Sequence, residues 1–498
     1  MAHNQNDDTA LKNGDACLTR RSVLQRAAWI TAVAAFPRVP GIAAGDVSPV
    51  MARLSTYMSE ARNRTLPDEV IEKAKHHILD TFAAMISGSG LPPGRAALKF
   101  ANSYGGEKVA TVVCSTVLCG PIEAALANGV LAHSDETDDA HSPSLSHPGS
   151  AVVPAALAVG EQFGIGGSQF LRAVVLGYDV GTRVVMTMGG PAVQSEDHRS
   201  GHSIAGVFGA GAAAGCAASL NTQQMRWVLD YTAQQSSGIA AWQRDTEHIE
   251  KGFVYAGMPA RSGVTSALLV QSGWTGVDDV LSGTDNFLLA YAPHADPAGL
   301  VEKLGERYEV TGTDIKKWTV GAPIQAPLDA LEILLKRHPL EAAQVQQVTV
   351  RIGTTPASVV NNREMPDICL QHMVAVMLLD KTASFAAAHN KARMQDPGVL
   401  RLRAKVQLIP DEELERRLPQ RVAIVEIILS DGTHLSERID AVRGTPANPM
   451  PRGEVVTKCR ELIAPVLGAA TTGSLIDKIL GLENVKNIRE LRPLLQRA

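Results

Sequence analysis

Aromatic side chains are scarce in this sequence. They make up 4% of its 498 residues, whereas alanine and glycine are abundant. A core built from such small side chains favours helices whose axes lie close together. The chain is also too long for one ordinary core, so we expect an enzyme of two domains.

An excess of positive charge is also absent. The formal net charge is −4 and the isoelectric point lies near 6.4. Nucleic acid and anionic lipid attract proteins through clustered basic side chains, so we expect neither as a partner. The six cysteines, at positions 17, 114, 119, 216, 369 and 459, show no metal-ligand spacing. We expect them to be small buried hydrophobic residues.

The first residues predict export rather than a membrane span. Arg20-Arg21 precedes an apolar stretch from Ala27 to Phe36, and small residues follow at 41–44. About ten apolar residues cannot span a bilayer, which needs about twenty. The pattern is similar to a twin-arginine signal peptide over residues 1–44. It predicts a folded periplasmic enzyme with no membrane attachment after export; a chance leader on a cytoplasmic enzyme is the alternative.

Residues 48–295 have the hydrophobic spacing of helices. Val70, Ile78 and Phe82 belong to a three-to-four repeat that opens at Pro67, which predicts an amphipathic helix. Residues 203–220 and 259–272 consist largely of small side chains. We expect both segments to be core helices of an all-helical domain.

Residues 300–447 change to a period of two. Apolar residues alternate or cluster at 348–352, 406–408 and 422–430, and Asp431-Gly432 marks a tight hairpin. Helices are expected at 326–336 and 372–388. The fold class is therefore mainly α, with a large all-helical domain plus a smaller α+β domain with an antiparallel sheet. Residues 448–498 are predicted to form helices that pack back on the helical domain.

Residues 133–147 form the densest polar cluster of the chain. Three histidines and four acids within it cannot all lie on one packed helix face, so they must line a loop or pocket. Imidazole with carboxylate suits Mn, Fe or Zn. The same groups also suit metal-free acid/base catalysis, which we favour. A solvated loop is the third possibility.

Other candidate residues lie far apart in the sequence. His202 stands at the start of a helix, where free amide groups suit a carboxylate, and Lys251 lies near another helix start. Lys316 and His372 are candidates from the second domain. Taken singly, His202 is equally typical of a hydrogen-bonded histidine at a helix end, and each of the other residues is typical of a charged side chain at the surface.

Several motifs occur together in one order along the chain. They are Asn128-Gly129, Ala132-His133, Asp138-Asp139, His147-Pro148, Gly201-His202 and Gly257-Met258-Pro259-Ala260-Arg261. This order resembles the MmgE/PrpD family, which includes 2-methylcitrate dehydratases, cis-aconitate decarboxylases and iminodisuccinate epimerases. The resemblance implies a homodimer with no metal and no organic cofactor, acting on a small polycarboxylic acid.

The resemblance also assigns roles to single residues. It implies that His147, His202 and Lys251 are catalytic. Candidates for binding substrate are Glu136, Asp138, Asp139, Arg261, Lys316 and His372. The decarboxylating relatives carry Asp, Thr and Tyr where this chain has Glu136, Ala140 and His372, so decarboxylation is not the reaction we expect.

The expected chemistry follows from the charge that must be stabilised. Removing a proton beside a carboxylate builds negative charge, which fixed cations such as Lys251 can hold while an imidazole accepts the proton. Either His147 or His202 could be that base, with the other acting on the second group. We predict a lyase that dehydrates a 2-methylcitrate-like acid. Epimerisation of a dicarboxylate, or carboxylate binding without reaction, are the alternatives.

Overall fold

The computed structural model describes residues 47–497. The predicted signal peptide and Cys17 lie outside this range, so export stays a prediction. Within the described range, every helix is too short or too polar to cross a membrane. The five cysteines in this range are buried and free, as expected.

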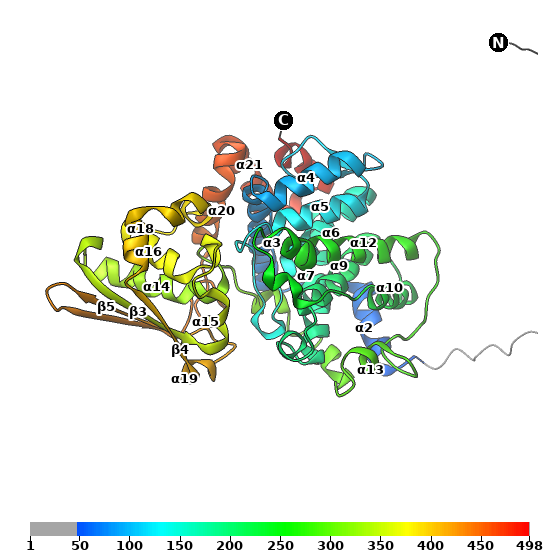
Figure 1. The fold of residues 1–498 in the computed structure, drawn as a ribbon. Helices are drawn as coiled ribbons and strands as arrows, with labels where there is room; N and C mark the ends of the chain where they lie inside the picture. The colour runs from blue at the N-terminus through cyan, green and yellow to red at the C-terminus, as the bar shows by residue number, and fades with distance from the viewer. Residues whose placement is uncertain (1–46, 498) are drawn as a thin grey trace, which may run out of the picture. The chain divides into compact units, whose positions relative to one another are not determined.

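The helical part is a bundle built around one core (Figure 1). The longer helices of the helical part are α2 (Pro49–Glu60), α3 (Asp68–Gly88), α4 (Pro92–Tyr104), α5 (Pro121–Ala132), α6 (Pro148–Phe163), α7 (Gly167–Met188), α9 (Gly201–Ala217), α10 (Thr222–Gln234) and α12 (Met258–Gln271). The predicted amphipathic helix is α3, and the two segments of small residues are α9 and α12.

Glycines let two of these helices touch through their backbones. A Cβ atom on Gly181 of α7 would lie 2.2 Å from the carbonyl oxygen of Ala205 in α9, and one on Gly209 would lie 2.8 Å from the carbonyl oxygen of Gly177. Only a residue without a side chain allows that approach. The abundance of small residues therefore lets helices pack closely, as the composition predicts.

The α+β part contains a sheet of four strands in the order β4-β3-β5-β6. The strands are β3 (Val345–Gly353), β4 (Val406–Asp411), β5 (Ala423–Leu429) and β6 (His434–Ile439). Helices α14 (Ala322–Arg337) and α16 (Leu370–Asp380) pack beside it. The hairpin at Asp431-Gly432 joins β5 to β6 in antiparallel register, with Gly432 at a φ of 87°.

The structure corrects two details of this part. β4 pairs with β3 in parallel, so the sheet is mixed, because the long helical connection between them returns the chain to the same end of the sheet. The helix expected over 372–388 is interrupted: α16 ends at Asp380, the next residue Lys381 adopts a left-handed φ of 61°, and α17 (Phe385–His389) follows. The mainly α fold with a smaller α+β part is confirmed.

The last helices contact the first ones. α20 (Arg452–Leu467) and α21 (Ala469–Leu480) pack against α3, and Leu462 and Ile476 belong to the core of the helical part. Lys458 of α20 lies 2.6 Å from the carboxylate of Asp80 in α3. Its ammonium group also donates to the carbonyl of Thr137 at 3.1 Å, so the C-terminal segment reaches the polar cluster.

Candidate active site

The polar cluster 133–147 forms the connection between α5 and α6. His133 caps the end of α5, and His147 occupies the position before the first residue of α6. The four acids of the cluster are all buried. Burial of so many charged groups requires partners from elsewhere in the chain, which excludes a solvated loop.

Glu136 receives two of these partners. Its carboxylate contacts the ammonium group of Lys251, and the ammonium of Lys316 lies 3.6 Å from its Oε2 atom. Lys316 also donates to the backbone carbonyl of Glu136 at 2.8 Å. Burial would raise the pKa of Glu136, but the two ammonium groups outweigh it and hold that pKa well below its ordinary value. Glu136 is therefore a carboxylate, and it gathers two cations.

Asp138 is shared by two histidines. Its Oδ2 lies 2.8 Å from Nδ1 of His133, and its Oδ1 lies 3.3 Å from Nδ1 of His147 and 3.6 Å from the ammonium of Lys316. Burial would raise the pKa of Asp138, but these three neighbours hold it well below its ordinary value. The charged carboxylate can therefore stabilise a proton that arrives on either ring.

The tautomer of His147 follows from its neighbours. Its Nδ1 lies 2.6 Å from the carbonyl oxygen of Asp139. Because a carbonyl can only accept a hydrogen bond, Nδ1 must carry the proton. A neutral His147 therefore has its lone pair on Nε2, as a general base requires.

The Asp139 side chain faces away from this ring. It accepts hydrogen bonds from Nδ1 of His77 at 2.9 Å, from the hydroxyl of Tyr178 and from the backbone N–H of Gly149 at 3.1 Å. These contacts tie the cluster to α3, α7 and α6. The carbonyl of Asp139 orients His147 and its carboxylate anchors the loop, while a role in substrate binding stays a prediction.

His202 lies beside His147, as the combined motifs predict. The two rings are stacked with centroids 5.2 Å apart, and Tyr255 contacts both of them, with its ring centroid 3.8 Å from that of His202 and 5.6 Å from that of His147. Ser200 caps α9 by accepting a hydrogen bond from the N–H of Ser203, which fixes His202 at the start of that helix. Burial and the positive charges nearby hold the pKa of His202 well below its ordinary value, so this imidazole is neutral.

A short irregular segment brings the remaining groups in. Lys251 belongs to α11 (Ile249–Gly252), and Tyr255 to a π-helical turn (Phe253–Gly257) that continues into α12. His248 precedes α11 with a φ of 63°, and its Nε2 lies 3.9 Å from the carboxylate of Glu136. Burial and Lys251 hold the pKa of His248 well below its ordinary value. Such strained and π-helical segments concentrate at functional sites.

Two groups of side chains could hold a metal ion. They are His133 with Asp138 and His147, and His133 with Glu136 and His248. Each carboxylate already faces an ammonium group, so a cation placed there would be repelled at close range. The donor set therefore suits an ion-paired organic site better than a metal.

Two predicted residues lie apart from this cluster. The side chain of Arg261 in α12 is exposed. His372 is buried in α16, where burial lowers its pKa to about 4 and its charged neighbours are Arg403 and Arg393 rather than the acids of the site. Neither residue hydrogen-bonds a cluster residue within 47–497, and His372 belongs to the packing of the α+β part.

Sequence reasoning overlooked several groups that the fold brings in. His248 and Tyr255 flank Lys251 in the sequence, and His77 lies within the buried part of α3. No residue pattern marks a positive φ or a π-helical turn. Only the position of His248, three residues before Lys251 in the sequence, could have indicated that it belongs to the site. His77 resembles any polar residue of an amphipathic helix.

The fold and the site define a mainly helical protein with a buried cluster of imidazoles, carboxylates and ammonium groups. The sequence matches the MmgE/PrpD N-terminal domain over residues 52–299 and the MmgE/PrpD C-terminal domain over residues 318–482. The chain belongs to the MmgE/PrpD family, as its motifs indicate. Membership supports a lyase-type function at the level of the family.

Curated relatives are similar at low identity. A cis-aconitate decarboxylase of Aspergillus terreus is 25% identical over 90% of this chain and 96% of its own length. The human cis-aconitate decarboxylase is 25% identical over 86% of this chain and 91% of its own. A cis-aconitate decarboxylase-like protein of Aspergillus oryzae is 27% identical over 62% of this chain, and the match spans 66% of that relative, just under two thirds.

Proposed function

We propose that this protein is a metal-free lyase that removes water from a small hydroxy polycarboxylic acid of the 2-methylcitrate type. The observation that carries the proposal is the arrangement around His147. Its Nδ1 is held by the carbonyl of Asp139 and by Asp138, while Lys251 and Lys316 provide positive charge nearby.

In the proposed reaction His147 takes the proton next to a substrate carboxylate through Nε2. The ammonium groups of Lys251 and Lys316 stabilise the negative charge that builds up on that carboxylate. Asp138 stabilises the imidazolium that forms, as an acid beside a catalytic histidine does. The carbon–oxygen bond then breaks, and the imidazolium returns its proton to the departing hydroxyl, which leaves as water.

Several features favour dehydration on one face of the substrate over epimerisation. An epimerase that used both imidazoles would need them on opposite faces of one carbon atom. The rings of His147 and His202 stack at 5.2 Å between centroids, which leaves no space for a carbon between them. The neutral state of His202 also makes it a poor proton donor, so a supporting hydrogen bond is its proposed role.

The distribution of charge argues against decarboxylation in the manner of the curated relatives. Glu136 already engages Lys251 and Lys316, at a position where the family resemblance implies an aspartate in decarboxylating members. Ala140 offers no hydroxyl at a position where the resemblance implies a threonine. These differences support a different fate for the bound acid.

Proton NMR in deuterated buffer tests the proposal. The full chain is incubated with 2-methylcitrate, citrate, malate and cis-aconitate, with and without EDTA. We expect vinylic signals of a dehydration product, unaffected by EDTA. Deuterium incorporation without loss of water would show epimerisation, carbon dioxide release would show decarboxylation, and the absence of all exchange would leave only a binding role.

A further inference from the structure

A cavity lies next to the site on the side of the α+β part. Its volume is about 370 Å³, which is in the range of small-molecule sites. Lys316 and Ala140 form part of its wall, so it borders the catalytic cluster directly. The opposite wall comes from the segment before β5, which includes Arg417 and Arg421.

The charged groups of this wall differ in how far they are already neutralised. Arg443 donates two hydrogen bonds to Glu454, and Asp440 accepts a hydrogen bond from Arg438 at 3.1 Å. Arg417 is exposed. Each of these charges has a partner or faces solvent.

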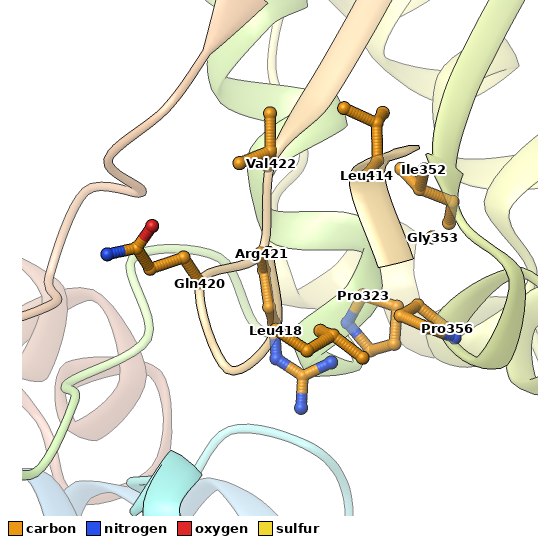
Figure 2. A pocket seen from close by; sticks show the side chains of 10 residues that line it. Pro323, Ile352, Gly353, Pro356, Leu414, Leu418, Gln420, Arg421 and Val422 are labelled. Atoms are coloured by element: carbon orange, nitrogen blue, oxygen red, sulfur yellow. The ribbon is translucent and has the colours of Figure 1, made fainter. Parts of the chain in front are cut away.

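Arg421 is half-buried and differs from these groups in its contacts. Its guanidinium makes no hydrogen bond and no ion pair with any residue between 47 and 497. Figure 2 shows its side chain directed away from those of Gln420 and Val422. Burial lowers the pKa of Arg421, and the charges of Asp314 and Glu136 oppose that shift. Arginine keeps its proton in such surroundings. Arg421 is therefore a cation with no bonded acid among residues 47–497, and the strongest charge acting on it is that of Asp314, which lines the same cavity.

The catalytic cluster itself has little positive charge to spare. Lys251 and Lys316 are balanced by the carboxylates of Glu136 and Asp138. His202 and His248 are neutral because burial depresses their pKa values. A substrate with three carboxylates would therefore enter an almost neutral pocket unless another cation receives its charge.

We propose that Arg421 and the adjoining cavity form a subsite for a carboxylate of the substrate that does not react. A guanidinium binds a carboxylate through two parallel hydrogen bonds, and none of the five donors of Arg421 is used by a residue between 47 and 497. The subsite selects a tricarboxylate over a dicarboxylate. It rests on the proposed function for its substrate class, but it can be measured without turnover.

Isothermal titration of the full chain tests the subsite with two unreactive acids. Tricarballylate has three carboxylates and no hydroxyl group to eliminate, and glutarate has two carboxylates. We expect Arg421→Gln to raise the Kd for tricarballylate about ten- to a hundredfold, the range for losing a charge-assisted hydrogen bond. The Kd for glutarate should change less than about twofold.

A neighbouring arginine provides the matched control. Arg416 is exposed and does not line the cavity, so Arg416→Gln removes the same charge and should leave both Kd values unchanged. Arg421→Lys keeps the charge without the paired donors and should weaken tricarballylate binding less than Arg421→Gln does. The lysine variant also provides the test if the glutamine variant fails to fold. Equal weakening of both acids by Arg421→Gln, or a wild-type protein that does not prefer tricarballylate, would overturn the subsite.

The two proposals can fail separately. If tricarballylate binding depends on Arg421 while no hydroxy acid loses water, the reaction is wrong and the subsite remains. If 2-methylcitrate is dehydrated and Arg421→Gln leaves tricarballylate binding unchanged, the reaction remains and the subsite is wrong.

Discussion

The two parts of the molecule bring charges of different kinds to the same place. The helical part supplies the carboxylates, on the single segment 133–147, together with the imidazoles of His147 and His202 and the ammonium group of Lys251. The α+β side adds cations to this segment: Lys316, and His389 with its Nε2 2.8 Å from Asp135. Ion pairs therefore hold the two parts together beside the site. The charges that would bind a substrate are the same charges that join the two parts.

The strongest test of the helical side is His147→Ala. We expect turnover to fall at least a hundredfold and up to about ten thousandfold, the range for losing a general acid/base. Initial rates measure the effect, and an unchanged melting temperature shows that the fold is intact. Turnover close to the wild-type value would remove His147 from the mechanism and leave the helical side as a binding surface.

Adjacent lysines test the α+β side. Lys316→Met leaves two buried carboxylates with one cation fewer and should destabilise the protein by about 3–5 kcal/mol. Lys317 pairs with Glu332 and is about a quarter exposed, so Lys317→Met should cost about 1 kcal/mol or less. Denaturant unfolding measures both variants, and equal losses would contradict the special role of Lys316.

The contact between His389 and Asp135 predicts how stability depends on pH. The ion pair with Asp135 and the charge of Asp367 outweigh burial and raise the pKa of His389 to about 9. Because the pKa is raised, the stabilisation is complete below pH 6.5, declines as pH rises, and is lost above about 9. Melting temperatures of wild type and His389→Gln should therefore converge across this window. A gap of constant size would show that the contact is not ionic.

The smallest effect is expected at His372. Replacing this buried histidine with leucine should change turnover less than about twofold, because no acid of the site faces it. Its pKa of about 4 means that wild type loses stability as pH falls from 6.5 towards 4, and His372→Leu should abolish that loss. Acid titration of the melting temperature measures this, and a large fall in turnover would place His372 in the site after all.

Much of the fold and part of the site could be predicted from the sequence. The repeat around Val70 and Ile78 produced α3, and the order of the motifs indicated the family. The segment 133–147 could be recognised because its polar groups are contiguous. Its meeting with His202, Lys251 and Lys316 came from the resemblance, since no local pattern encodes contacts between distant residues.

Other features depend on tertiary packing alone. The parallel pairing of β4 is set by where a long connection returns, and the break at Lys381 is a backbone conformation that composition does not reveal. Asp139 and His147 were both selected for their side chains. The structure shows that a backbone carbonyl of the first fixes the tautomer of the second, which residue identity cannot disclose.

The backbone contact between α7 and α9 also bears on how such a site can evolve. His147 and His202 belong to the starts of different helices, so their separation depends on how closely the helices of the bundle pack. Gly209 of α9 packs against both α7 and α6, where a Cβ would lie 2.8 Å from the carbonyl oxygen of Gly177 and 2.9 Å from the side chain of Val152. A single added methyl group at Gly209 would therefore push α9 away from α6 and alter the spacing of the imidazoles. New reactions could therefore arise from changes in the interior of the bundle while every catalytic side chain is retained.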